Sequence, residues 1–224
     1  MSLKKDSCEN CENHTESVLC VFSEVSTLLD KIKVKCRYKH GQSIFMEGNE
    51  PLGIFILQSG LVKLEVNSCE GNSHTLRIIG PGGIIGYRSL LAGESYKANA
   101  IAIEDSDLCF IPKNEFIEIL KKHPESSLKF MQFICKDLRQ AEEKWIDQID
   151  KGAPQRVAEA ILFLQDQFKD QQWTRKEIAQ WAGTTPETVM RTLAQFERDG
   201  LVDQSGRKIL ILKRDKIIEK SHHL

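Results

Sequence analysis

Short apolar or alternating stretches separated by glycine-rich turns dominate residues 34–112. Leu61–Val66 alternates with period two, and other apolar runs include Gly53–Leu57 and His74–Ile79. Runs of this length with regular turn signals are typical of strands in a small all-β barrel or jelly roll. Immediately before them, residues 21–33 place apolar side chains at helical spacing, which predicts a short helix.

A different pattern begins at Pro124 and continues to Lys151 without another proline or any glycine. Apolar residues recur there at steps of three and four, which predicts a long helix with an apolar stripe of roughly three heptads. The stripe either packs on the barrel or packs against a second copy of the helix. Its length and the presence of Trp145 favour self-association. The predicted dimer interface consists of Met131, Ile134, Leu138, Ala141, Trp145 and Ile149.

The segment Gly152-Ala153-Pro154 interrupts this helix and marks a domain boundary. Residues 156–168 then predict another amphipathic helix, and residues 174–199 predict two helices joined by a tight turn. Residues 201–212 read as a β-hairpin. A helix-turn-helix followed by a hairpin is a winged helix-turn-helix, and we expect this region to form one.

Local capping signals define the two helices of the helix-turn-helix. Thr174 is followed three residues later by Glu177, the pattern of a capping box that opens the first helix. Gly183 ends that helix. Thr185 can cap the second helix, and Pro186 stands at its first position, where a missing N–H costs nothing.

The second helix has one buried and one outward face. At about 100° per residue, Val189, Leu193 and Phe196 share the buried face, and Glu187 and Arg191 lie opposite. Arginine can donate to guanine O6 and N7, and glutamate can accept from cytosine N4, so this face suits base recognition in a major groove. The alternative is an ordinary surface ion pair one turn apart. The two capped helices favour DNA recognition. The predicted DNA-contacting residues are Thr184, Thr185, Glu187, Thr188, Met190, Arg191, Gln195, Arg207 and Lys208.

Charge adds modest support for a polyanionic partner. Residues 151–224 carry thirteen Lys or Arg against ten acidic residues, a net charge of +3, whereas the whole chain has a net charge of −1. Arg207 and Lys208 at the predicted hairpin tip suit phosphate contacts, although a solvated turn has the same composition.

Length and composition define the class of protein. The chain has 224 residues, 41% of them hydrophobic and 28% charged, which is ordinary for a folded globular protein. No apolar run approaches the roughly 20 residues of a membrane span, and the polar N-terminus lacks a secretory signal. We therefore expect a cytoplasmic protein without a membrane partner. The expected segments are a Cys-containing N-terminus at 1–20, a sensory β-domain at 21–123, a dimerisation helix at 124–151 and a DNA-binding domain at 152–224.

Cysteine usage suggests a metal or redox function. Three of the seven cysteines, namely Cys8, Cys11 and Cys20, lie within the first twenty residues. A disulfide framework is not expected, because the cytoplasm keeps thiols reduced.

The whole pattern resembles the CRP/FNR family of bacterial transcription regulators over essentially the full chain. Residues 41–48 and 54–60 resemble the start of the family's cyclic-nucleotide-binding roll, and Glu187–Arg191 resembles its recognition helix. FNR-type members usually have serine where this chain has Met190. The resemblance implies an α+β fold with an N-terminal β-roll (a double-stranded β-helix or jelly roll), a long dimerisation helix and a C-terminal winged helix-turn-helix. It also implies a homodimer that binds palindromic double-stranded DNA and acts with RNA polymerase.

The cAMP-binding members of this family share two motifs that the chain lacks. They have Gly-Glu, whose carboxylate holds a ribose hydroxyl, followed by Arg-Ser/Thr-Ala, whose arginine pairs with the cyclic phosphate. This chain has Gly86-Tyr87-Arg88 and Tyr96-Lys97-Ala98 there. We therefore do not expect it to bind cAMP.

The cysteines resemble the ligand set of FNR-type members, which hold a [4Fe–4S] cluster. Cys8, Cys11 and Cys20 match the N-terminal group, and Cys109 stands where the fourth ligand does. Four thiolates are the set that this cluster requires. The gap between Cys11 and Cys20 is longer than usual for the family. Alternatives are a zinc site or thiol switch at the N-terminus with Cys109 as a buried strand residue, or an unidentified effector.

The sequence thus predicts a sequence-specific DNA-binding regulator that senses oxygen, redox state or nitric oxide. Two alternatives are a regulator of the same type gated by another ligand or by thiol or zinc chemistry, and a redox or metal-binding protein without a DNA role. No catalytic motif is evident, so enzymatic activity is not expected.

Overall fold

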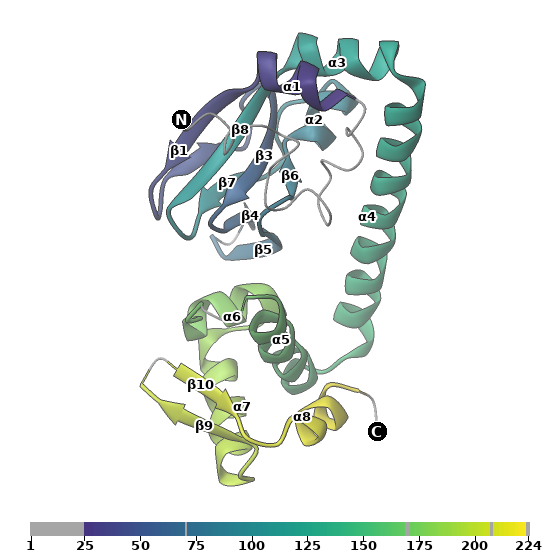
Figure 1. The fold of residues 1–224 in the computed structure, drawn as a ribbon. Helices are drawn as coiled ribbons and strands as arrows, with labels where there is room; N and C mark the ends of the chain where they lie inside the picture. Colours follow the sequence, from purple (N-terminus) through teal and green to yellow (C-terminus); the bar gives the residue numbers. More distant parts are fainter. Residues whose placement is uncertain (1–24, 70, 169–170, 207, 223–224) are drawn as a thin grey trace. The chain divides into compact units, whose positions relative to one another are not determined.

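The computed structural model describes residues 25–69, 71–168, 171–206 and 208–222. Its internal contacts divide the chain into two compact units, whose elements are labelled in Figure 1. The first unit extends to Asn67 and resumes over Leu76–Leu138. The second contains Ser68–Thr75 and everything from Arg139 onward.

The N-terminal domain is a roll of two four-stranded sheets, with strand orders β1-β8-β3-β6 and β2-β7-β4-β5. Pairing is antiparallel throughout the first sheet. The strands are β1 (Val34–Tyr38), β2 (Ser43–Phe45), β3 (Gly53–Ser59), β4 (Val62–Asn67), β5 (Ser73–Ile79), β6 (Ile84–Ile85), β7 (Asn99–Ala102) and β8 (Ser106–Pro112). The accompanying helices are α1 (Ser26–Ile32), α2 (Tyr87–Ala92) and α3 (Lys113–Lys122).

Successive side chains of the central strands point to opposite faces of the sheet and so belong to two separate hydrophobic cores. Phe55 and Leu57 of β3 belong to a cluster enclosed between the two sheets. Ile54 and Ile56 of the same strand belong to a second cluster, which the helices α1, α2, α3 and the start of α4 cover. Burial of each such side chain contributes about 1.5–3 kcal/mol, so β3 is stabilised from both faces.

The long helix α4 (Pro124–Asp150) follows α3 directly. Phe130 is buried in the helix-covered core, and Phe133 and Ile134 pack partly against it. One side of the N-terminal half of α4 is therefore fixed to the roll by apolar contacts.

The C-terminal unit contains a helical core and a two-stranded hairpin, as a winged helix-turn-helix requires. Its elements are α5 (Ala153–Gln167), α6 (Arg175–Ala182), α7 (Pro186–Arg198), β9 (Val202–Ser205), β10 (Lys208–Ile211) and α8 (Arg214–Ser221). The predicted fold class is confirmed. No described helix is both long and apolar enough to cross a membrane.

Candidate nucleic-acid interface and effector domain

The predicted caps of the helix-turn-helix are present. Thr174 Oγ1 accepts the Glu177 N–H at 3.2 Å, and the Glu177 carboxylate accepts the Thr174 N–H at 2.8 Å, which completes a capping box. Gly183 ends α6 in the left-handed region with φ 61°. Thr185 Oγ1 then accepts the Thr188 N–H at 3.3 Å and caps α7. These bonds fix the turn between the helices.

The two faces of α7 are as the helical spacing predicts. Val189, Leu193 and Phe196 are buried, whereas Glu187 and Arg191 are exposed. Arg191 lies on the face of α7 opposite the buried residues. The guanidinium of Arg191 is therefore available to an external acceptor.

Hydrogen bonds at the start of α7 stabilise the ionised form of Glu187. Its carboxylate accepts hydrogen bonds from its own backbone N–H and from the Thr185 hydroxyl, which lowers the pKa of this carboxyl below its usual range. A carboxylate in the first turn also interacts favourably with the helix dipole. Glu187 is thus ionised at neutral pH, the form that accepts from cytosine N4.

The other predicted DNA-contacting residues differ in their surroundings. Met190 is 51% exposed beside Arg191, and Lys208 is exposed on β10. Gln195 makes contacts within its own helix, donating to Asp199 at 2.8 Å and accepting from Arg198 at 2.6 Å. Thr184 and Thr188 are partly buried at the turn. Arg207 lies outside the described residues.

A set of polar contacts that sequence reasoning missed joins the wing to both helices. Glu197 of α7 accepts the Gln204 backbone N–H at 3.0 Å and its side-chain amide at 3.1 Å. The Gln204 amide oxygen accepts from Arg175 of α6 at 2.8 Å. Gln204 therefore sets the position of the hairpin that carries Lys208. No local motif signals this contact, because Arg175 and Gln204 lie 29 residues apart.

The interior of the roll is filled by aromatic side chains. Tyr96 stacks on Phe45 with ring centroids 3.8 Å apart and planes within 10°. Burial, with a smaller contribution from Tyr38, raises the pKa of Tyr96 to about 12. Lys97 is exposed and lies 3.5 Å from Glu94 at the surface. Tyr96 thus occupies the interior as a neutral phenol, and Lys97 is turned outward.

A buried carboxylate on α4 forms ion pairs and a hydrogen bond with side chains from β5 and α2. Asp137, only 5% exposed, lies 2.6 Å from Arg77 Nη2 and 2.5 Å from Arg88 Nη2, and it accepts the Tyr87 hydroxyl. Burial and the bond to Asp137 raise the pKa of Tyr87, which keeps the phenol protonated as a donor. Asp137 therefore connects the long helix to the part of the roll around Tyr87 and Arg88.

Replacing Asp137 with asparagine should destabilise the N-terminal domain. The variant removes the countercharge of two guanidinium groups but keeps the side-chain size. Because Arg77 and Arg88 are partly exposed and solvent screens them, we expect a loss of about 1–3 kcal/mol, below the cost of breaking a fully buried pair. This loss of stability should appear as a lower midpoint of urea unfolding, measured by far-UV circular dichroism. Asp107→Asn, which disrupts an exposed pair with Arg37, is the matched control and should change the midpoint less. An unchanged midpoint in Asp137→Asn would contradict this role.

Cys109 lies on the helix-covered face of β8. Its neighbour Leu108 points into the core between the sheets, whereas Cys109 joins the core that contains Val25 and Leu29 of the α1 region. Cys109 is 5% exposed. Cys8, Cys11 and Cys20 lie outside the described residues.

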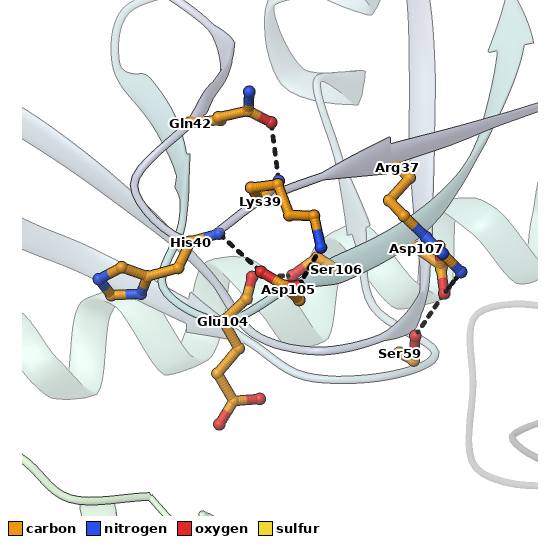
Figure 2. A network of polar contacts seen from close by, with 9 residues as sticks. All are labelled: Arg37, Lys39, His40, Gln42, Ser59, Glu104, Asp105, Ser106 and Asp107. Carbon is orange, nitrogen blue, oxygen red and sulfur yellow. Dashed lines mark hydrogen bonds and ion pairs between the residues drawn. The ribbon is translucent and has the colours of Figure 1, made fainter.

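An exposed polar network fixes the beginning of β8 against β1 (Figure 2). Asp107 accepts from Arg37 Nε at 2.6 Å, and Asp105 accepts from Lys39 Nζ at 2.6 Å and from the His40 N–H at 3.0 Å. These bonds hold the pKa of both carboxyls below the usual range. Because Arg37 pairs directly opposite Asp107 in the strand register, the network maintains the alignment of the strand that carries Cys109.

Most of the predicted interface on α4 is solvent-exposed within one chain. Trp145 is 67% exposed, and Leu138 is 56% exposed. Met131, Ala141 and Ile149 are also exposed, whereas Ile134 is partly buried against the roll. The roll is contacted instead by Phe130 and Asp137, on another side of α4. Within the first unit, Met131 and Leu138 are therefore not part of the surface that packs on the roll, whereas Ile134 is.

A capped helix-turn-helix with a wing, joined by a long helix to a β-roll, is the architecture of a two-domain DNA-binding regulator. Residues 35–123 match the cyclic nucleotide-binding domain family, and residues 155–219 match the Crp-like helix-turn-helix domain.

Comparison with individual proteins leads to the same class. The chain is 30% identical to the cyclic AMP receptor protein of Thermus thermophilus over 168 residues, 74% of this chain and 77% of that protein. It is 24% identical to the fumarate and nitrate reduction regulatory protein of Vibrio cholerae over 224 residues, covering 94% and 89% of the two chains. A solved transcriptional regulator of the CRP/FNR family from Thermus thermophilus superimposes with a TM-score of 0.72 and 26% identity, covering 84% and 98%. The chain belongs to the CRP/FNR family of DNA-binding transcription regulators.

Proposed function

We propose that this regulator senses oxygen, redox state or nitric oxide through a [4Fe–4S] cluster held by Cys8, Cys11, Cys20 and Cys109. It acts in the cytoplasm as a homodimer on palindromic DNA, together with RNA polymerase, and has no enzymatic activity. The observation that carries the sensory assignment is the position of Cys109. The similarity to the Vibrio relative, whose name refers to fumarate and nitrate reduction, also supports the proposal of redox sensing.

Cys109 fits the position of a cluster ligand. Its side chain leaves β8 on the face that Val25 and Leu29 cover, and these residues directly follow the segment that contains the other three cysteines. Exclusion of water protects iron–thiolate bonds, and Cys109 is almost fully buried. When bound, the cluster would supply a centre that oxygen and nitric oxide can attack. The described residues hold Cys109 on β8, whose alignment with β1 is fixed by strand pairing, and Asp137 connects the roll to α4.

Dimer formation through α4 is supported by the exposed apolar stripe. Met131, Leu138, Trp145 and Ile149 are large side chains that lie open to solvent on one helix. By helical spacing these residues share one face of α4, and exposed apolar side chains gathered on one face mark interaction sites. A second copy of α4 in a two-fold arrangement would cover the stripe with the same residues.

A cyclic nucleotide is not the proposed effector. At the position where the cAMP-binding members have the arginine that pairs with the cyclic phosphate, this chain has Tyr96. Tyr96 instead stacks on Phe45 there, and Arg88 is bonded to Asp137. These positions support an effector other than cAMP.

Iron and acid-labile sulfide per monomer after anaerobic purification test the proposal. The wild type should contain both, with absorption near 400 nm. Cys109→Ser, reconstituted without oxygen, should lose the iron and with it oxygen-dependent DNA binding, because an incomplete ligand set leaves the cluster open to solvent. Cys36→Ser, at a partly exposed thiol on the neighbouring strand, is the matched control and should keep both properties.

Two outcomes would contradict the cluster. Full iron content in Cys109→Ser would remove Cys109 from the ligand set and contradict the proposed four-cysteine site. Zinc in place of iron in the anaerobically purified wild type would exclude the cluster while leaving the DNA-binding assignment intact.

A further inference from the structure

The last turns of α4 pack closely against the helix-turn-helix within the second unit. Lys144 Nζ lies 3.4 Å from the centroid of the Trp181 ring on α6, and Trp181 stacks in turn on Phe163 of α5 at 4.8 Å. At the turn after α6, a Cβ added to Gly183 would approach Gln148 Oε1 to 2.6 Å. The end of the long helix therefore contacts both α6 and the turn that leads to α7.

The Arg156 side chain forms hydrogen bonds both to the end of α6 and to the residue that follows α4. The Arg156 guanidinium, on the first turn of α5, donates through Nε to the Ala182 carbonyl at 2.8 Å and through Nη2 to the Gly183 carbonyl at 3.2 Å. Its third nitrogen, Nη1, donates to the Lys151 carbonyl at 2.5 Å. Lys151 directly follows α4, and Ala182 and Gly183 are the last residue of α6 and its cap.

The chemistry of these acceptors explains why an arginine stands here. The last carbonyls of a helix lack intrahelical partners and form the negative end of the helix dipole. Two such helix ends meet at Arg156, and its planar guanidinium offers donors in several fixed directions at once. A lysine ammonium is a compact charge without this fork, so it cannot reproduce all three bonds in the same geometry.

The bonded carbonyls are close in sequence to the DNA-reading surface. After Gly183, Thr184 and Thr185 are the two residues that precede α7, and the Thr184 N–H is fixed to the Ala179 carbonyl at 3.0 Å. Any movement of the Gly183 carbonyl relative to Lys151 would therefore turn α7 relative to the end of α4.

From these contacts we infer that Arg156 is a positioning residue for DNA recognition, which sets the direction of α7 relative to the end of α4. In a dimer joined along α4, this direction determines the separation of the two recognition helices. The inference rests on the proposed dimer. It assigns a function to a residue that touches neither DNA nor effector.

The test compares affinities for two kinds of duplex. One carries both half-sites selected by the wild-type protein, and the other keeps one half-site and scrambles the second. Arg156→Lys should bind the two-half-site duplex about tenfold more weakly, the equivalent of one charge-assisted hydrogen bond, and the single-half-site duplex as the wild type does. It should also tolerate insertion of one base pair between half-sites better than the wild type. Arg214→Ala, which breaks an exposed pair with Asp166 in the same unit, should behave as wild type on every duplex.

The outcomes separate positioning from folding. An equal loss on both duplexes would overturn the inference, because it would mean that Arg156 only maintains the fold of the unit. Wild-type affinity and spacing preference in both Arg156→Lys and Arg156→Gln would overturn it as well. A wild-type protein without preference for the two-half-site duplex would instead contradict the proposed dimer, and this inference with it.

Discussion

Leu138→Glu should convert the protein from a dimer into a monomer. In a two-fold interface each substituted residue would face its own copy, which buries two like charges and costs several kcal/mol, on the order of a broken buried ion pair. The chain itself should still fold, because Leu138 is 56% exposed and Glu remains solvated in the monomer. Loss of the dimer should abolish high-affinity binding to a site with two half-sites.

Sedimentation at micromolar concentration measures this directly. Lys136→Glu is the matched control, since it adds a carboxylate at an exposed position of α4 outside the apolar stripe, and it should remain a dimer. A Leu138→Glu variant that still sediments as a dimer would place the interface elsewhere.

Arg191→Ala should weaken binding to the cognate duplex by about 1–3 kcal/mol and relax preference at one base pair of each half-site. Arg191 is exposed on the outward face of α7, so its loss should leave stability unchanged. The expected loss of binding free energy is that of one bidentate hydrogen-bonded contact between arginine and the edge of a guanine. Fluorescence anisotropy with cognate and single-base-substituted duplexes gives both quantities.

Arg198→Ala provides the comparison on the same helix. Arg198 is also exposed but lies at the C-terminal end of α7 and is bonded to Gln195 at 2.6 Å, so its loss should not alter base preference. If Arg191→Ala still discriminated cognate from substituted half-sites as the wild type does, Arg191 would not read that base pair.

The elements that sequence analysis predicted correctly depend on local rules. The capping box at Thr174 and Glu177, the glycine end of α6 and the Thr185 cap each need residues three or four positions apart. The buried stripe of α7 follows from its helical period. The resemblance to the CRP/FNR family supplied the order of domains, which the comparisons confirm.

The features that escaped sequence analysis depend on distant residues or weak patterns. α2 has six residues, too few to show a period, and α8 has only two apolar residues, Ile217 and Ile218, of which Ile217 is buried. The bond from Arg88 to Asp137 spans 49 residues, and no local rule predicts such a partner. The apolar stripe on α4 follows from helical spacing, whereas Cys109 is singled out by the family resemblance, and the functions assigned to both stay predictions.

Selection of bound duplexes from a random pool, with the purified protein prepared without oxygen, tests the central claim most directly. Two copies of α7 reading DNA from a symmetric dimer should enrich an inverted repeat whose half-sites lie about one helical turn apart, near 34–36 Å. Arg191→Ala should lose enrichment at one G·C pair in each half. A pool that shows no enriched sequence, or one in which the wild type and Arg191→Ala enrich identical sites, would contradict sequence-specific recognition through α7.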